Sequence, residues 1–251
     1  MITWCMMMVV MLAVPAGVLY IYKVSYARKL ARAVGRMLVF LGLTAGGVQL
    51  VLSYSHWLVA AGWLLLMVGV SVLMVLHTSR LSWKDFMVPV AAGVCTAVVL
   101  AGLLTALAMS NMLEVWKAGF LIPVAGMLTA GLVTCCGKGL STYYMGLRHH
   151  GKLYDYLLAN GASHSEALAY FTHRALERAL LPCLSMMGGV VISSAPALMW
   201  GMVVAGAPVL TAVAMEVALL LAALCCSVIS VVVTLFVVRR FAFDSYLRIK
   251  G

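Results

Sequence analysis

The chain has 251 residues, of which 65% are hydrophobic and 10% are charged, and its mean hydropathy is +1.10. A soluble domain carries about a quarter charged residues and must cover its surface with polar groups. The composition therefore excludes an ordinary soluble domain and predicts a membrane protein.

The net charge of +10 does not indicate a nucleic-acid partner. The basic residues cluster in a few short segments between apolar runs, a pattern typical of membrane topology. The seven cysteines include two vicinal pairs and lie within apolar runs, so they predict no disulfide framework. We expect them to behave as small hydrophobic residues.

Seven apolar segments are candidates for membrane-spanning helices, because about 20 apolar residues cross about 30 Å of hydrocarbon. The chain is therefore expected to be an all-α, polytopic protein with a single transmembrane domain over residues 1–251. Basic residues follow the first apolar segment and do not precede it, which favours a retained span over a cleaved signal peptide. The expected spans are Thr3–Tyr22, Met37–Leu52, Trp57–Leu76, Phe86–Met109, Phe120–Met145, Leu180–Val204 and Val209–Val238.

The distribution of basic residues predicts the topology. If the chain crosses the membrane at each expected span, 16 of the 17 Lys and Arg residues lie in or beside the connections on one side of the membrane. Only Lys117 lies on the other side. The positive-inside rule then places the N-terminus outside and the C-terminus in the cytoplasm. We expect a multi-pass protein of the cell (inner) membrane, surrounded by lipid.

The largest segment outside the membrane, about residues 148–179, is expected to be cytoplasmic. Asn160-Gly161 is a turn signal, and Ser163 with Glu166 forms the pattern of a capping box at the start of a helix. The segment therefore predicts two short helices joined at a glycine, the second leading into the sixth span. A transporter driven by a separate ATPase needs such a rigid part, because a flexible linker cannot transmit a push. An ordinary structured loop is the alternative interpretation.

Several short motifs follow one another along the chain. They are Val34-Gly35-Arg36, Ile122-Pro123-Val124-Ala125-Gly126-Met127, Gly161-Ala162, Glu166-Ala167, Leu181-Pro182, Pro196-Ala197-Leu198-Met199-x-Gly201, Ala205-Gly206 with Pro208, and Arg239-Arg240-Phe241. In this order and spacing, the motifs resemble those of the Fet-type iron-export ABC permease family of bacteria. The resemblance covers nearly the whole chain.

This resemblance implies a homodimeric permease that works with two copies of a cytosolic ABC ATPase and moves a metal ion such as iron outward. The chain contains no G-x-x-x-x-G-K-[ST] motif, so we expect no catalytic residue and no cofactor on it, and ATP on the partner subunit. The residues expected to couple the chain to the ATPase are Leu157, Asn160, Gly161, Ala162, Ser163, Glu166, Ala167 and Phe171.

The expected substrate path is built around Glu216, because an ionisable group among apolar neighbours indicates function. The other candidates are polar, thioether or helix-breaking residues of the spans, and two further prolines are expected to kink helices. The path candidates are Met127, Ser193, Ser194, Pro196, Met199 and Glu216, and the kink candidates are Pro123 and Pro182.

No metal ligand set follows from the sequence. Met and Cys side chains could bind a thiophilic ion, whereas iron favours oxygen ligands, of which the spans have few. Three alternatives remain open: an ABC permease for a non-metal substrate, one half of a heteromeric transporter, and a membrane enzyme or assembly factor without an ATPase. The absence of an H-E-x-x-H motif gives no support to a metalloprotease.

Overall fold

The computed structural model describes residues 27–54, 57–79, 81, 83–109, 118–189 and 197–241, and every regular element in these ranges is an α-helix. The chain divides into two compact units, Met1–Tyr54 and Ser55–Gly251. The first unit contains helix α2 (Ala27–Tyr54), which begins well before the expected span. The basic segment that opens it is therefore helical.

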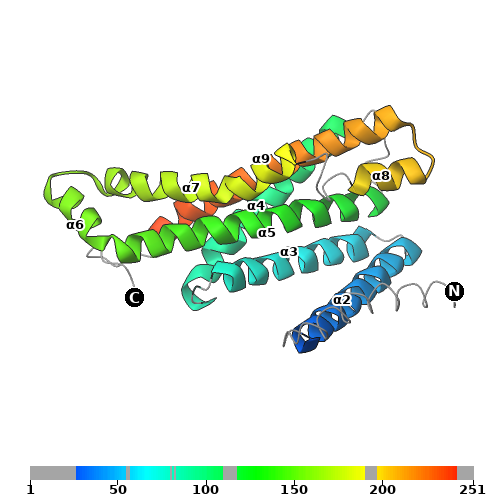
Figure 1. The fold of residues 1–251 in the computed structure, drawn as a ribbon, viewed down its shortest axis with the longest axis horizontal. Coiled ribbons are helices and arrows are strands. Elements are labelled where there is room, and N and C mark those ends of the chain that lie inside the picture. Colours follow the sequence, from blue (N-terminus) through cyan, green and yellow to red (C-terminus); the bar gives the residue numbers. More distant parts are fainter. Residues whose placement is uncertain are drawn as a thin grey trace. The chain divides into compact units, whose positions relative to one another are not determined.

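The second unit is a helical bundle, and at one end of it a short helix turns into a long helix that runs back along the bundle (Figure 1). Its long helices are close to the expected spans, because apolar runs of this length satisfy their backbone hydrogen bonds only within a helix. Its elements are α3 (Trp57–Ser79), α4 (Trp83–Met109), α5 (Ala118–His149), α6 (Gly151–Ala159), α7 (His164–Gly188), α8 (Ala197–Val204) and α9 (Val209–Phe241).

Five of the described helices, α2, α3, α4, α5 and α9, are long and apolar enough to cross a membrane. This confirms the expected polytopic helical class. The first expected span lies outside the described residues. The sixth, Leu180–Val204, is not one described helix: α7 ends at Gly188, α8 begins at Ala197, and residues 190–196 between them lie outside the described ranges.

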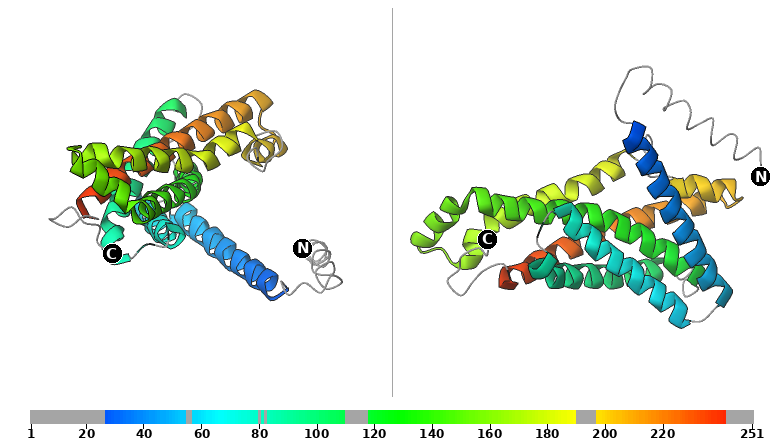
Figure 2. Two further views of the ribbon diagram at one scale, coloured as in Figure 1. Left: turned by 60° about the vertical axis from the view of Figure 1, so that its left-hand side comes forward. Right: turned by 90° about the horizontal axis from the view of Figure 1, so that it is seen from below.

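Helix α5 is the centre of the second unit. It packs against α3, α4, α7 and α9, and the views of Figure 2 show it among them. Helix α4 also packs closely along α9, at Gly93: a Cβ there would collide with the Thr234 side chain and come within 2.8 Å of the Ser230 carbonyl oxygen. Small residues allow such close approach between helices in a membrane.

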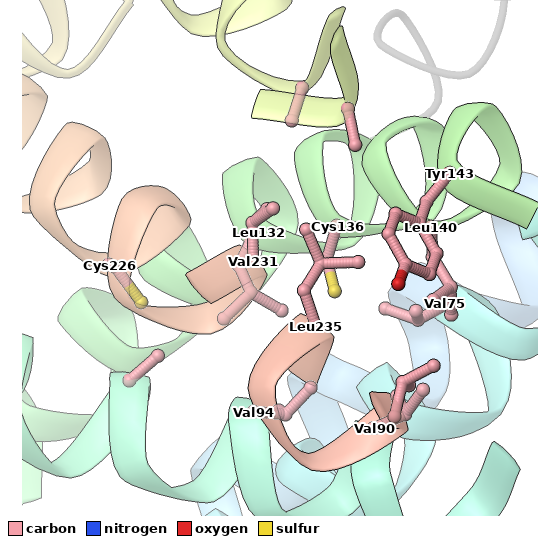
Figure 3. Packing of buried hydrophobic residues seen from close by; sticks show 14 of the residues in the cluster. Val75, Val90, Val94, Leu132, Cys136, Leu140, Tyr143, Cys226, Val231 and Leu235 are labelled. Atoms are coloured by element: carbon pink, nitrogen blue, oxygen red, sulfur yellow. The ribbon is translucent and has the colours of Figure 1, made fainter. Parts of the chain in front are cut away.

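The core of this bundle is formed by aliphatic, cysteine and tyrosine side chains (Figure 3). Cys136 of α5 is fully buried, and its Sγ lies 3.7 Å from Thr234 Oγ1 of α9. Tyr143, about two helical turns further along α5, is also buried. The buried face of α5 thus extends from the apolar middle of the bundle to the end that carries α6 and α7.

Candidate functional site

The turn between α6 and α7 forms where the Asn160-Gly161 signal predicts it. Gly161 has φ +84°, in the left-handed region that favours glycine. The N–H of Gly161 donates to Leu158 O at 3.0 Å, and the N–H of Ala162 donates to Leu157 O at 3.1 Å. These bonds close the end of α6 and reverse the chain into α7.

The predicted capping box at the start of α7 is confirmed. The backbone N–H of Ser163 donates to Glu166 Oε2 at 2.8 Å, and the N–H of Glu166 donates to Ser163 Oγ at 3.4 Å. The Ser163 hydroxyl also donates to Glu166 Oε2 at 2.7 Å. These hydrogen bonds, from the Ser163 hydroxyl first and then from its backbone, lower the pKa of Glu166. The start of α7 is therefore fixed locally, without help from a partner.

One face of α7 anchors this helix to the rest of the bundle. Leu168, Phe171 and Ala175 are buried against it. The Phe171 ring fits against Gly146 of α5, where a Cβ would lie 3.3 Å from Phe171 Cδ1. At the same level, Arg239 of α9 donates to Thr172 Oγ1 at 2.9 Å. Helix α7 is thus held by both α5 and α9.

A polar contact ties α6 to α7. Tyr154 is buried, and its hydroxyl lies 2.8 Å from Nδ1 of His164, the first residue of α7. The two rings meet edge to face, with centroids 6.0 Å apart. The α6–α7 hairpin, residues 151–188, is therefore a packed structure rather than a flexible loop, as expected for a part that transmits force.

The structure divides the predicted coupling residues into two groups. Asn160, Gly161, Ser163 and Glu166 are exposed, and Ala162 is partly exposed, so these can meet a partner protein. The three other residues are less accessible, and their part in coupling stays a prediction. Ala167 and Phe171 are buried against the bundle, and Leu157 is half-buried against its core. They hold the hairpin in place and offer little or no surface for a partner.

Two exposed residues of α6 were missing from the predicted contact set. Tyr156 is 64% exposed and Leu153 is 39% exposed. They are three positions apart and therefore share a face of the helix. The short apolar stripe of α6 was the signal in the sequence, but a stripe alone does not say which of its members face the bundle.

Replacement of Gly161 with valine should loosen the hairpin. A Cβ at this position meets nothing within 4 Å, so the cost is conformational, about 1–2 kcal/mol for a residue in the left-handed region. Gly161→Asn is the matched control, because asparagine tolerates this region. Limited proteolysis should cut the valine variant faster within residues 160–163 than the asparagine variant. Equal cutting of the two would contradict the turn geometry.

Leu168→Asp should destabilise the whole bundle. The side chain is fully buried, and an unpaired carboxylate there is expected to cost about 3–5 kcal/mol. Leu153→Asp, which makes the same change on the exposed face of α6, should leave the thermal unfolding temperature in detergent almost unchanged. Similar losses in both variants would show that this face of α7 is not packed as described.

The hairpin should weaken on acidification. Burial, and then the positive charge of Arg239, lower the pKa of His164 from its ordinary value of 6.5. His164 therefore binds a proton more tightly in the unfolded chain than in the folded one. Stability is lost as the pH falls below 6.5 toward the lower pKa that His164 has in the folded chain. Between pH 7.5 and 5.5 the Tm should fall more for the wild type than for His164→Gln. His173→Gln, at an exposed position, should behave like the wild type.

A cavity of about 440 Å³ lies within the bundle, between α5, α7, α8 and α9. It brings together Met127 and Glu216, two residues of the predicted substrate path, although they are far apart in the sequence. Four sulfur-bearing side chains contribute to its wall. Its lining residues are Met127, Ala130, Gly131, Thr134, Cys135, Pro182, Cys183, Met186, Leu198, Glu216, Leu219, Leu220 and Ala223.

Glu216 is the acidic residue of this cavity. It is 6% exposed, and its Oε2 accepts a hydrogen bond of 3.2 Å from the backbone N–H of Met199. Met199 lies in the first turn of α8, where free N–H groups favour a negative charge. The carboxylate of α9 therefore holds the start of α8 at the edge of the cavity. Met199, a predicted path residue, contacts Glu216 through its backbone N–H.

The other predicted path and kink residues have different outcomes. Ser193, Ser194 and Pro196 lie outside the described residues. Pro123 and Pro182 lie inside α5 and α7, and neither ends its helix. Among the described residues, no three His, Cys, Asp or Glu side chains are placed to hold a metal ion. The cavity is thus an apolar space with one carboxylate, and its role in transport remains a prediction.

Comparison with known proteins identifies the family. The model described as "Uncharacterised protein family (UPF0014)" matches residues 2–243. The chain belongs to this family. Membership of this family, together with the described membrane helices, is consistent with a transporter permease. No curated protein and no solved structure matches this UPF0014 chain in the comparisons.

Proposed function

We propose that the chain is the membrane-spanning permease subunit of an ABC transporter and is driven by a separate cytosolic ATPase. The observation that supports this most directly is the α6–α7 hairpin. It is packed, it exposes an apolar face at α6, and its second helix enters the bundle without a break at Pro182. A rigid helix of this kind can carry a conformational change from a partner into the membrane.

Helix α7 offers a direct route from the hairpin to the cavity. Leu168 anchors its first half, and Met186 lines the cavity near its other end. At 1.5 Å per residue, about 27 Å of helix separates them. Because one helix carries both, a displacement of the hairpin moves one wall of the cavity without any further joint.

The exposed face of α6 is the proposed docking surface for the ATPase. It presents Tyr156 and Leu153 beside the turn residues Asn160 and Gly161. An aromatic anchor among polar neighbours is typical of a protein–protein contact. In the proposed assembly, two copies of the chain form a homodimer in the cell (inner) membrane, and each copy meets one ATPase subunit.

The proposed cargo is a metal ion such as iron that moves outward, as the family resemblance implies. The cavity is compatible with a cation, because the carboxyl group of Glu216 offers oxygen ligands in an otherwise apolar space. In this proposal ATP binds to the partner subunit, and this chain neither hydrolyses ATP nor holds a cofactor.

Affinity purification of the tagged chain from native membranes, followed by mass spectrometry, tests the partner. We expect an ATPase with a Walker motif to co-purify, and we expect its ATP hydrolysis to rise when the two are reconstituted together in liposomes. A Walker-lysine variant of that ATPase serves as the control for background hydrolysis. The proposal would be contradicted if the folded chain purified from several detergents without any ATPase.

A further inference from the structure

A second hollow, of about 610 Å³, opens between α3, α5 and α7 near the end of the bundle that carries the hairpin. Its lining contains cationic and hydroxyl side chains and no acidic residue. The residues are Thr78, Gly137, Lys138, Ser141, Thr142, Met145, Gly146, His149, His150, Arg178 and Leu181.

The two cations of this hollow lack an acidic partner. Within the part of the chain that the structure describes, neither Lys138 nor Arg178 forms an ion pair or a hydrogen bond. Lys138 also lies inside the apolar span of α5, Phe120–His149. A lysine in a span is costly unless its charge is compensated or reaches the membrane surface, and an anionic ligand in the hollow would compensate it there.

An apolar surface continues the hollow along α7. Leu181 lines the hollow and is 54% exposed, and Leu184, three residues further on the same helical face, is 51% exposed. Arg178 precedes Leu181 by the same spacing. One face of α7 therefore carries a cation and then two exposed leucines, in the direction that leads toward the middle of the bundle.

The surroundings of the hollow place it at one surface of the membrane. Arg148 and His149 end α5 beside it, and Arg239 lies at the same end of α9, where it contacts Thr172. Basic residues gather on the cytoplasmic side of a membrane protein. The hollow then lies at the level of the inner-leaflet head groups, and the leucines lie at the level of the acyl chains.

We propose that this hollow binds an anionic phospholipid, with its phosphate between Lys138 and Arg178 and an acyl chain along Leu181 and Leu184. Arg178 can bind two phosphate oxygens at once, and Lys138 adds a compact charge. The hydroxyls of Ser141 and Thr142 are further donors in the lining. Basic pockets between transmembrane helices on this side of a membrane suit lipid head groups. A free phosphate would leave the apolar face of α7 unused.

The test compares lipid retention by the purified full chain in mixed micelles of phosphatidylglycerol and phosphatidylcholine, read by native mass spectrometry. The wild type should retain phosphatidylglycerol preferentially, and Lys138→Gln with Arg178→Gln should reduce that preference at least about tenfold. Lys152→Gln with Arg174→Gln removes two charges from the hairpin outside the hollow and should leave the preference unchanged. Lys138→Arg with Arg178→Lys keeps the charges and should restore most of it.

Three outcomes would overturn the proposal. The first is an equal loss in the hairpin control, which would show that net charge alone attracts the lipid. The second is displacement of phosphatidylglycerol by millimolar inorganic phosphate, which would show a site for a free anion. The third is an unchanged lipid preference in the double glutamine variant. None of these outcomes depends on an ATPase partner, so the lipid site and the proposed transport function can fail separately.

Discussion

Replacing Tyr156 with aspartate is expected to weaken ATPase binding and to lower ATP-driven transport strongly, while leaving the bundle folded. The tyrosine is exposed on α6 and contributes little to the core, so the Tm in detergent should stay close to that of the wild type. At a docking surface, loss of a central aromatic side chain typically costs 2 kcal/mol or more in binding. That corresponds to a loss of affinity of about thirtyfold for the ATPase.

Tyr170→Asp is the matched control for this variant. Tyr170 is also an exposed aromatic residue, but it lies on α7 beyond the turn, next to Phe171 and Arg174. It should retain most of the ATPase affinity and of the ATP hydrolysis measured in liposomes. If Tyr170→Asp releases the ATPase and Tyr156→Asp does not, the docking surface lies on α7 and the proposed contact at α6 is wrong.

The second large effect is expected at Glu216. Glutamine keeps a carbonyl oxygen that can accept the hydrogen bond from the Met199 N–H, so the start of α8 should stay in place. The charge that would attract a cation into the cavity is lost. Transport of the metal ion by Glu216→Gln in liposomes should therefore fall at least about tenfold, a barrier change of about 1.4 kcal/mol.

Two further variants separate charge from structure at this position. Glu216→Asp keeps the charge on a shorter side chain and should transport better than Glu216→Gln. Glu177→Gln removes an exposed carboxylate of α7 and should have no effect on transport. The ATPase should co-purify with all three. A Glu216→Gln variant that transports at the wild-type rate would show that this carboxylate serves only to hold α8.

The features that could be predicted from the sequence are those set by short-range rules. The turn at Gly161 and the box formed by Ser163 and Glu166 depend on neighbours within three or four residues, and both are present. The same holds for the long helices, because an apolar run of about 20 residues has few alternatives in a membrane. The continuation of α7 into the bundle could also be predicted, because the sequence between Glu166 and Pro182 contains no strong signal that ends a helix.

The features that could not be predicted depend on long-range packing. Ala167 and Phe171 carry the same apolar signal whether they face a partner or α5, and only the position of Gly146 opposite Phe171 decides between the two. The cavity joins Met127 and Glu216 through the packing of α5 against α9, which no local spacing reveals. The bond from Met199 to Glu216 requires a backbone donor, which a search for side-chain ligands does not detect.

The central claim is that the hairpin is the contact through which an ATPase moves the bundle. Its most direct test is a photo-crosslinking amino acid, benzoyl-phenylalanine, placed at Tyr156 and illuminated in native membranes. We predict an adduct with an ATP-binding subunit, and a much weaker adduct from the same amino acid at Tyr170. An intense adduct at Tyr170 with none at Tyr156, or adducts with lipid alone at both positions, would contradict the account.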